Sequence, residues 1–154
     1  MTLEYRIPIT EDRRLEPEWK DQVERWYQLD ENGYIFCEAL YHWKKQDRLS
    51  QFDAVVLLIP EGSNLSDVEF VTTKPASPAK FVYTLPNIAG SLVAQLTGFQ
   101  GPIFCFCENT ANPNVNLFAE KLSSQGYKKV FLLESSLQLN DRQERVVRGM
   151  FFEG

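Results

Sequence analysis

Apolar residues recur along this chain in short runs with two different periods, which predict strands and helices in alternation. Residues 54–59 and 129–134 are almost continuously apolar, as strands are when both faces of their sheet are covered. Residues 34–46 instead repeat apolar positions every three or four residues, which is typical of a helix with one buried face. The other predicted elements are an edge strand over 3–9, a helical stretch from Pro17 to Leu29, a helix over 88–97, a strand over 103–108, a helix from 112 to about 125, and a strand over 145–152.

Residues that break or cap regular structure set the bounds of these elements. The alternation of strands and helices predicts one layered α/β domain over residues 1–154, in which the strand around Ile103 is central. The signals are a break at Asn32-Gly33, a cap at Asn87, a left-handed end at Gly98, a turn at Gly101-Pro102, a cap and first turn at Asn112-Pro113, and a helix end at Gly126.

Composition and charge narrow the class of protein. The chain has 154 residues, of which 44% are hydrophobic and 24% charged, as in an ordinary globular protein. Its net charge of −5 argues against nucleic acid as a partner, since phosphates require clustered Lys and Arg. No apolar run approaches the ~20 residues of a membrane span, and the N-terminus has no secretory pattern. We therefore expect a cytoplasmic protein without membrane contact.

Candidate metal ligands are sparse in the sequence. The chain has three cysteines and one histidine, His42, and their spacing matches no zinc site. Cys105 and Cys107 lie two residues apart on a predicted strand, so both side chains point to one face. We expect these cysteines to be reduced and to lie buried, where they act as small hydrophobic residues. We expect neither a metal nor a cofactor.

The segment from Phe81 to Thr110 carries a family resemblance. It reads FVYTLPNIAGSLVAQLTGFQGPIFCFCENT: a Pro-Asn entry, a helix of small residues, a Gly-Pro turn and an apolar strand. This order resembles the part of β-ketoacyl synthases, which are thiolase-like condensing enzymes, that leads to the catalytic cysteine. The resemblance covers roughly residues 52–136. It implies the N-terminal half of a thiolase-like fold, layered around a central mixed and mostly parallel sheet, in a truncated chain. The resemblance also requires the strands around Ile103 and Val130 to be neighbours in this sheet.

The resemblance also implies that the catalytic machinery is missing. The spacing after Gly101-Pro102 puts Thr110 where the family has its nucleophilic cysteine. A threonine hydroxyl needs an adjacent base to become nucleophilic, and the family's histidines come from a second half that this chain lacks. His42 is predicted to be a helix-face residue. We thus predict no catalytic residue, with Thr110 as a degenerate nucleophile position and Cys107, buried within its strand, Glu108 and Asn109 as weaker candidates.

The function predicted from this resemblance is that of an accessory subunit. The chain would be a non-catalytic ketosynthase-like interaction protein in fatty-acid or polyketide-type biosynthesis, paired with itself or with a full-length ketosynthase-type subunit. Acyl carrier protein is a further candidate partner. A lone thiolase half would expose an apolar sheet surface, which favours association. Candidate interface residues are Asn87, Leu92, Phe104 and Phe106.

Two other hypotheses remain open on the sequence. In the first, the chain is an enzyme: part of a split condensing enzyme, or a hydrolase or decarboxylase of acyl- or malonyl-carrier protein that uses residues near Thr110. In the second, the chain is an unrelated small α/β module.

Overall fold

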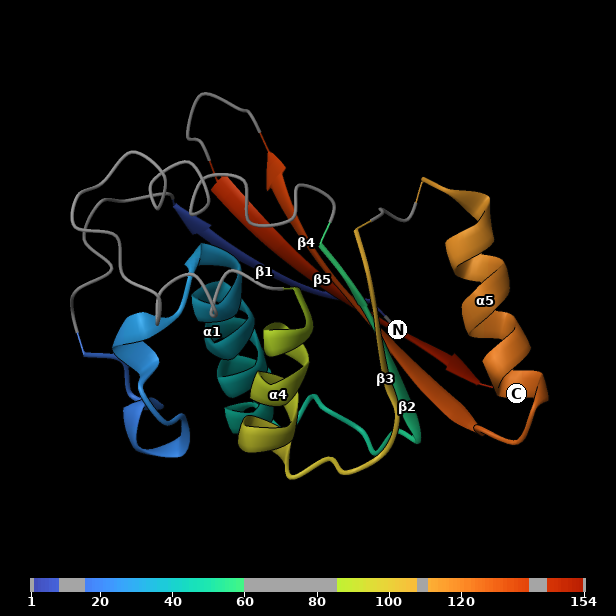
Figure 1. Ribbon diagram of the computed structural model, residues 1–154, viewed down its shortest axis with the longest axis horizontal. Coiled ribbons are helices and arrows are strands. Elements are labelled where there is room, and N and C mark those ends of the chain that lie inside the picture. The colour runs from blue at the N-terminus through green and yellow to red at the C-terminus, as the bar shows by residue number, and fades with distance from the viewer. Residues whose placement is uncertain (1, 9–15, 60–85, 108–110, 139–143, 154) are drawn as a thin grey trace.

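In the part of the chain that the structure describes, five strands form one mixed sheet, with helices packed on both of its faces (Figure 1). The computed structural model describes residues 2–8, 16–59, 86–107, 111–138 and 144–153. The strands are β1 (Thr2–Pro8), β2 (Ala54–Leu58), β3 (Ile103–Phe106), β4 (Lys129–Gln138) and β5 (Glu144–Glu153). The helices are α1 (Glu31–Lys45), α4 (Pro86–Thr97) and α5 (Pro113–Ser124), with two short 3₁₀ helices, η1 (Lys20–Gln22) and η2 (Trp26–Gln28).

The strand order is β1-β5-β4-β2-β3. β2 runs parallel to β3 and β4, whereas β5 runs antiparallel to β4 and β1. The layered α/β fold with a mixed sheet is therefore confirmed, with half of the strand pairings parallel. Two expectations about its centre are wrong. β3 is an edge strand among the described residues, and β2 lies between β3 and β4, so the strands around Ile103 and Val130 are not neighbours.

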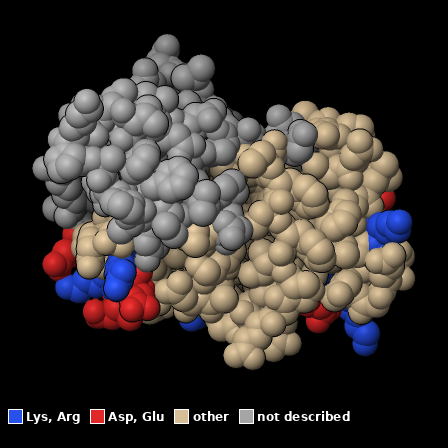
Figure 2. Space-filling view, viewed as in Figure 1, with Lys and Arg blue, Asp and Glu red and all other residues tan. Residues whose placement is uncertain are grey.

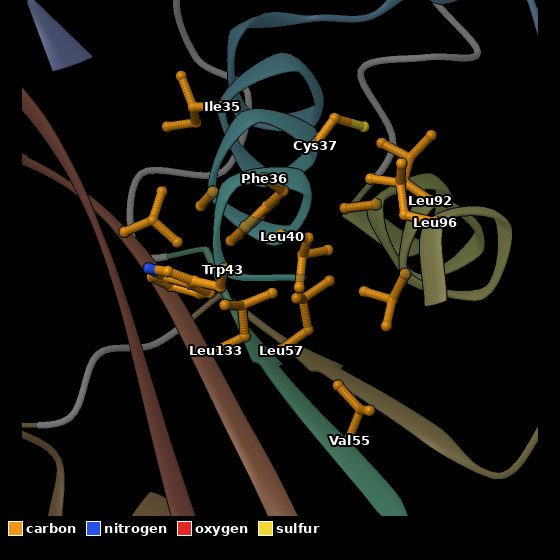
Figure 3. Close-up of a cluster of buried hydrophobic side chains, with 14 of the residues drawn as sticks. Ile35, Phe36, Cys37, Leu40, Trp43, Val55, Leu57, Leu92, Leu96 and Leu133 are labelled. Carbon is orange, nitrogen blue, oxygen red and sulfur yellow. The ribbon is translucent and has the colours of Figure 1, made fainter. Parts of the chain in front are cut away.

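The larger core lies between the sheet and the pair α1 and α4 (Figure 3). Leu40 and Trp43 of α1 are fully buried there, facing Leu57 and Leu133 of the sheet. α4 adds Leu92 and Leu96 from its inner face. These residues come from the helical period of α1 and α4 and from alternate positions of the strands, so the predicted buried stripes meet in one core.

A smaller core lies on the opposite face, under α5. Val115, Ala119 and Leu122 of this helix pack on β2 and β4. The chain moves outward from β2 to β3 through α4 and then back past β2 to β4 through α5. Because parallel crossovers share one handedness, this reversal of direction puts α4 and α5 on opposite faces of the sheet. Figure 1 shows α5 standing apart from α1 and α4 in this way.

The predicted helix from Pro17 to Leu29 is wrong. This stretch forms η1 and η2, and Arg25 between them is left-handed with φ 54°. Trp19 and Val23 are nevertheless buried in the main core. Their spacing in the sequence is that of a helix. The contacts of both side chains with the core stabilise a different backbone conformation, so tertiary packing overrides local propensity here.

The predicted break at Asn32-Gly33 is also wrong, because α1 begins before it. The Asp30 carboxylate accepts a 2.7 Å hydrogen bond from the Gly33 amide and caps the helix. A Cβ at Gly33 would lie 3.1 Å from Leu92 Cδ1, so the glycine allows α4 to approach α1 closely. The glycine therefore serves helix packing instead of breaking the helix.

The other bounds agree more closely with the sequence. α4 starts at Pro86, so Asn87 is the second residue of the helix and not its cap. Gly98 and Gly126 have φ values of +76° and +108° just after α4 and α5, as predicted for helix ends. The predicted cap at Asn112, the strand over 145–152 and the N-terminal edge strand are confirmed as the cap of α5, β5 and β1.

Glu38 of α1 joins the first strand and the 3₁₀ segment to the main core. Its carboxylate accepts hydrogen bonds from the Tyr5 hydroxyl, at 3.2 Å, and from Trp19 Nε1, at 3.0 Å. Partial burial, together with the neighbouring Glu38 carboxylate, raises the pKa of Tyr5 to about 12. The folded state thus holds the phenolic proton at pH values where the unfolded chain has lost it.

Tyr5→Phe is expected to lower the free energy of unfolding by about 1–2 kcal/mol at neutral pH, through loss of the bond to Glu38. This advantage of tyrosine is present below pH 10 and declines as pH rises towards 12, because the unfolded state releases the proton first. Urea titrations of both proteins at about pH 8 and pH 11 measure the change. If wild type and Tyr5→Phe differed in free energy of unfolding by the same amount at both pH values, this prediction would be contradicted. Tyr27→Phe, at an exposed tyrosine, is the control.

Candidate functional site

The sequence places the candidate nucleophile between β3 and α5. Thr110, Asn109 and Glu108 lie outside the described residues, so their roles remain predictions. β3 ends at Phe106, and Cys107 follows it in a bend and is exposed. The expectation that Cys107 is buried within the strand is therefore wrong: the strand is shorter than its apolar pattern, and Cys107 lies beyond its last paired residue.

The first backbone N–H groups of α5 already have hydrogen-bond partners. Pro113, the first helical residue, has no N–H. The Asn114 amide donates to Asn112 Oδ1 at 3.0 Å, and the Val115 amide donates to the Asn112 carbonyl at 3.1 Å. A helix N-terminus stabilises an anion through free N–H groups, and these two amides already have partners. The described start of α5 is thus built as a capped helix end, without an open oxyanion site.

The buried and half-buried thiols have the properties of structural cysteines. Burial raises the pKa of Cys37 well above its ordinary value. Cys105 is half-buried, and desolvation followed by the nearby Cys107 raises its pKa as well. A raised pKa keeps a thiol protonated and unreactive. Among the described residues no group of His, Cys, Asp and Glu is arranged to hold a metal ion.

His42 lies far from the β3–α5 junction. It is exposed in the last turn of α1, and its ring centroid is 5.1 Å from that of Tyr5 in β1. β1 and β3 form opposite edges of the sheet, which at about 4.8 Å per strand puts them roughly 19 Å apart. α1 and α5 also lie on opposite faces. This geometry agrees with the predicted role of His42 as a helix-face residue.

The four interface candidates have different environments. Leu92 is buried in the main core between α4 and α1, so its side chain does not reach the surface. Phe104 and Phe106 are half-buried, and each packs edge-on against Phe118 of α5 with ring centroids 5.2 Å apart. Asn87 has its backbone in α4, and its side chain lies outside the described residues. Their roles at an interface remain predictions.

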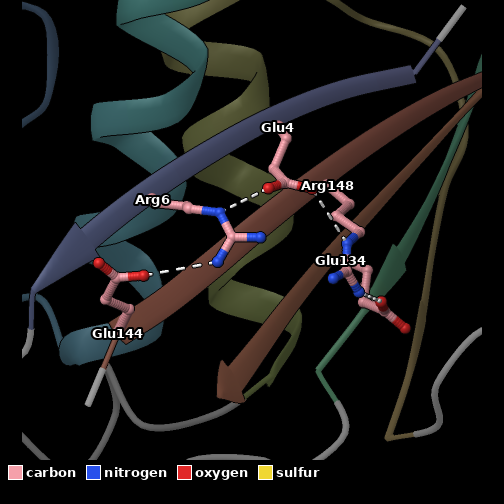
Figure 4. Close-up of polar contacts among 5 residues, drawn as sticks. All are labelled: Glu4, Arg6, Glu134, Glu144 and Arg148. Atoms are coloured by element: carbon pink, nitrogen blue, oxygen red, sulfur yellow. Dashed lines mark hydrogen bonds and ion pairs between the residues drawn. The ribbon is translucent and has the colours of Figure 1, made fainter. Parts of the chain in front are cut away.

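Five charged side chains of β1, β4 and β5 form a network of ion pairs on the face of the sheet that α5 also occupies (Figure 4). The apolar sheet surface expected of a lone thiolase half stays a prediction. Arg6 contacts Glu4 at 2.6 Å and Glu144 at 3.4 Å, and Arg148 contacts Glu4 at 3.5 Å and Glu134 at 3.9 Å. Alternate charged positions in β1 and β5 are the sequence signal for this polar face.

An uncharged surface lies elsewhere, over α4, β3 and α5. From Phe81 to Ala119 the sequence has a single charged residue, Glu108. Figure 2 shows the consequence: the described surface over α4, β3 and the near side of α5 is largely free of Lys, Arg, Asp and Glu, which gather at its margins. Depletion of charge is typical of the centre of a protein–protein interface. This uncharged run is visible in the sequence, but the sequence was not used to predict an uncharged surface from it.

Comparison with solved structures agrees with the predicted fold. The chain is similar to a chain from the structure of a ketosynthase, ApeO, in complex with its chain length factor, ApeC, from Xenorhabdus doucetiae. The TM-score is 0.62 at 13% sequence identity, covering 84% of this chain and 60% of that chain. At this identity the likeness shows the fold, which is thiolase-like and ketosynthase-like α/β. This chain spans less than two thirds of the matched chain.

The sequence itself matches neither a protein-family model nor a curated protein. Among the described residues, no helix is long and apolar enough to cross a membrane.

Proposed function

We propose that this protein is a non-catalytic, ketosynthase-like accessory subunit in fatty-acid or polyketide-type biosynthesis. It acts in the cytoplasm as a dimer, either with itself or with a full-length ketosynthase-type subunit, and acyl carrier protein is a further candidate partner. It has no metal or cofactor. The similar solved protein is a ketosynthase with a chain length factor, which makes such pairing a reasonable starting point for this chain.

One observation supports this function best. The fold is that of a ketosynthase, but the single histidine lies at the opposite edge and on the opposite face of the sheet from the β3–α5 junction. General-base catalysis requires the base within about 3 Å of the proton that it accepts, or one water molecule away. His42 is therefore too far from this junction to act as the base for a hydroxyl there. The protein thus has a ketosynthase-like fold, but His42 is not placed to act as a general base at the β3–α5 junction.

Incubation of the purified protein with malonyl- and acyl-carrier protein tests this proposal. Intact-mass spectrometry is expected to show no gain of an acyl group, and the malonyl group is expected to stay carboxylated. The variant Cys107→Ser runs in parallel because Cys107 is exposed, and an active β-ketoacyl synthase serves as positive control. An adduct mapped to Thr110, or an adduct in the wild type that Cys107→Ser abolishes, would refute the non-catalytic role and favour the enzyme hypothesis.

A further inference from the structure

We propose that the Glu38 carboxylate of α1 binds a primary ammonium group at the end of an alkyl chain, in a site bordered by four aromatic rings. The rings are those of Tyr5, Trp19, Tyr34 and His42. Since α1 and β1 build this site, it lies near the opposite edge of the sheet from β3. It is separate from the β3–α5 junction, and the proposed function does not depend on it.

The Glu38 carboxylate is half-buried, and its two donors are both neutral. Its Oε2 atom accepts from the Tyr5 hydroxyl at 3.2 Å, and its Oε1 atom accepts from Trp19 Nε1 at 3.0 Å. Among the described residues, no Lys or Arg forms an ion pair with it. Lys45, further along α1, pairs with Glu18 at 3.2 Å instead. A carboxylate has about four lone-pair positions, so Glu38 can accept from a further, charged donor.

Aromatic rings from three elements lie next to this carboxylate. Tyr34 and His42 are four residues before and after Glu38, so they share its face of α1. The Tyr34 ring packs edge-on against Trp19, with centroids 5.2 Å apart, and the His42 ring centroid is 5.1 Å from that of Tyr5. Aromatic rings attract cations and also offer apolar surface to the methylene groups of an alkyl chain. The surroundings therefore suit both parts of an alkylammonium ion.

The site reaches the surface on one side and is closed on the other. His42 is exposed, and Tyr5 and Tyr34 are half-buried, whereas Trp19 is only 1% exposed. Partial burial lowers the effective dielectric constant, so a cation is attracted to Glu38 more strongly than to a fully exposed carboxylate. The Tyr5 oxygen, which donates its proton to Glu38, remains an acceptor for a second N–H group. A primary ammonium has three N–H donors and can use both acceptors at once.

Titration of the ¹⁵N-labelled protein with n-butylammonium chloride at constant ionic strength tests the site by nuclear magnetic resonance. The indole N–H signal of Trp19 is expected to shift, because this group is bonded to Glu38. The indole signal of Trp43, which is fully buried in the main core, is the internal control. The neutral 1-butanol is expected to bind roughly tenfold or more weakly, since it lacks the charge. Equal binding of the alcohol, or no selective shift of the Trp19 signal, would overturn the proposal.

Two glutamate variants test whether the charge of Glu38 is responsible. Glu38→Gln keeps an oxygen that can accept a hydrogen bond but removes the charge, and it is expected to raise the dissociation constant of n-butylammonium roughly tenfold or more. Glu120→Gln is the matched control: Glu120 is an exposed helix residue that also forms no ion pair among the described residues. Equal effects of the two variants would contradict the site. The comparison with 1-butanol uses the wild type, so it decides the proposal even if Glu38→Gln does not fold.

The source of the ammonium group is distinguished with a second probe. Nα-acetyl-lysine N-methylamide carries the same group on a peptide unit. If it binds more tightly than n-butylammonium, the natural ligand is a lysine side chain of a partner protein; if it binds more weakly, the ligand is a free alkylamine. Failure of both probes to bind would overturn the site and leave the accessory role, which carrier-protein incubation tests, unaffected.

The pH dependence of binding identifies the charged form of the ligand. A primary alkylamine loses its proton near pH 10.4, the usual value for lysine, so binding of n-butylammonium is expected to fall at least threefold between about pH 9 and about pH 11. The Tyr5 hydroxyl keeps its proton over this range, because burial and the Glu38 carboxylate raise its pKa to about 12. Isothermal titration calorimetry measures the change, and equal affinity at the two pH values would contradict an ammonium site.

Discussion

Replacement of Arg145 by methionine is expected to lower the free energy of unfolding by about 3–5 kcal/mol. Arg145 of β5 and Glu31 of α1 form an ion pair at 3.3 Å with side chains only 4% and 6% exposed. The guanidinium also donates to Asn32 Oδ1, at 3.3 Å. Methionine fills much of the same volume but leaves the Glu31 carboxylate buried without this cation. Urea denaturation followed by circular dichroism measures the loss.

Two further variants separate burial from charge. Arg6→Met removes an arginine of comparable length from the exposed ion pairs on the other face, and we expect a cost of no more than about 1 kcal/mol. The double variant Glu31→Leu, Arg145→Met removes both buried charges and is expected to be more stable than Arg145→Met alone. If Arg145→Met cost no more than Arg6→Met, the buried pair would not anchor α1 to β5 as described here.

Leu40→Ala is expected to destabilise the protein by about 2–5 kcal/mol. Leu40 is fully buried in the middle of α1, where it faces the sheet and α4 (Figure 3). Truncation removes its contacts and leaves a cavity that the surrounding helices and strands cannot fully close. The midpoint of urea unfolding measures the effect.

Leu117→Ala is the matched control for this substitution. Leu117 is also a helix leucine, but it is 59% exposed on α5. Its truncation is expected to change the free energy of unfolding by less than about 0.5 kcal/mol. Similar losses for the two variants would mean that the outer face of α5 is buried in solution, and the assignment of this face as surface would be wrong.

The sequence predicted the fold best where hydrophobic period and helix ends agree. The predicted helices over residues 34–46 and 112–125 lie close to α1 and α5. In each, the apolar stripe and the residues at the helix ends indicate the same helix. The stretch from Pro17 to Leu29 was mistaken for a helix because Trp19 and Val23 have helical spacing. Their burial in fact depends on contacts with residues distant in sequence, such as the bond from Trp19 to Glu38, which no local pattern reveals.

The candidate site was less predictable than the fold. Strand order is set by pairings between distant segments, so the sequence did not show that β3 is an edge strand and that β2 separates it from β4. The apolar pattern through Cys107 predicted a longer strand than the one that pairs with β2. The polar face of β1 can be read from the sequence, because Glu4 and Arg6 alternate with apolar residues such as Leu3 and Tyr5.

The mass of the protein in solution tests the central claim most directly. We propose that this ketosynthase-like chain works by association, as a dimer with itself or with a ketosynthase-type subunit. Light scattering after gel filtration at micromolar concentration should give twice the chain mass of 17.8 kDa. A strict monomer of 17.8 kDa, both alone and in a mixture with a ketosynthase subunit, would contradict the proposed association.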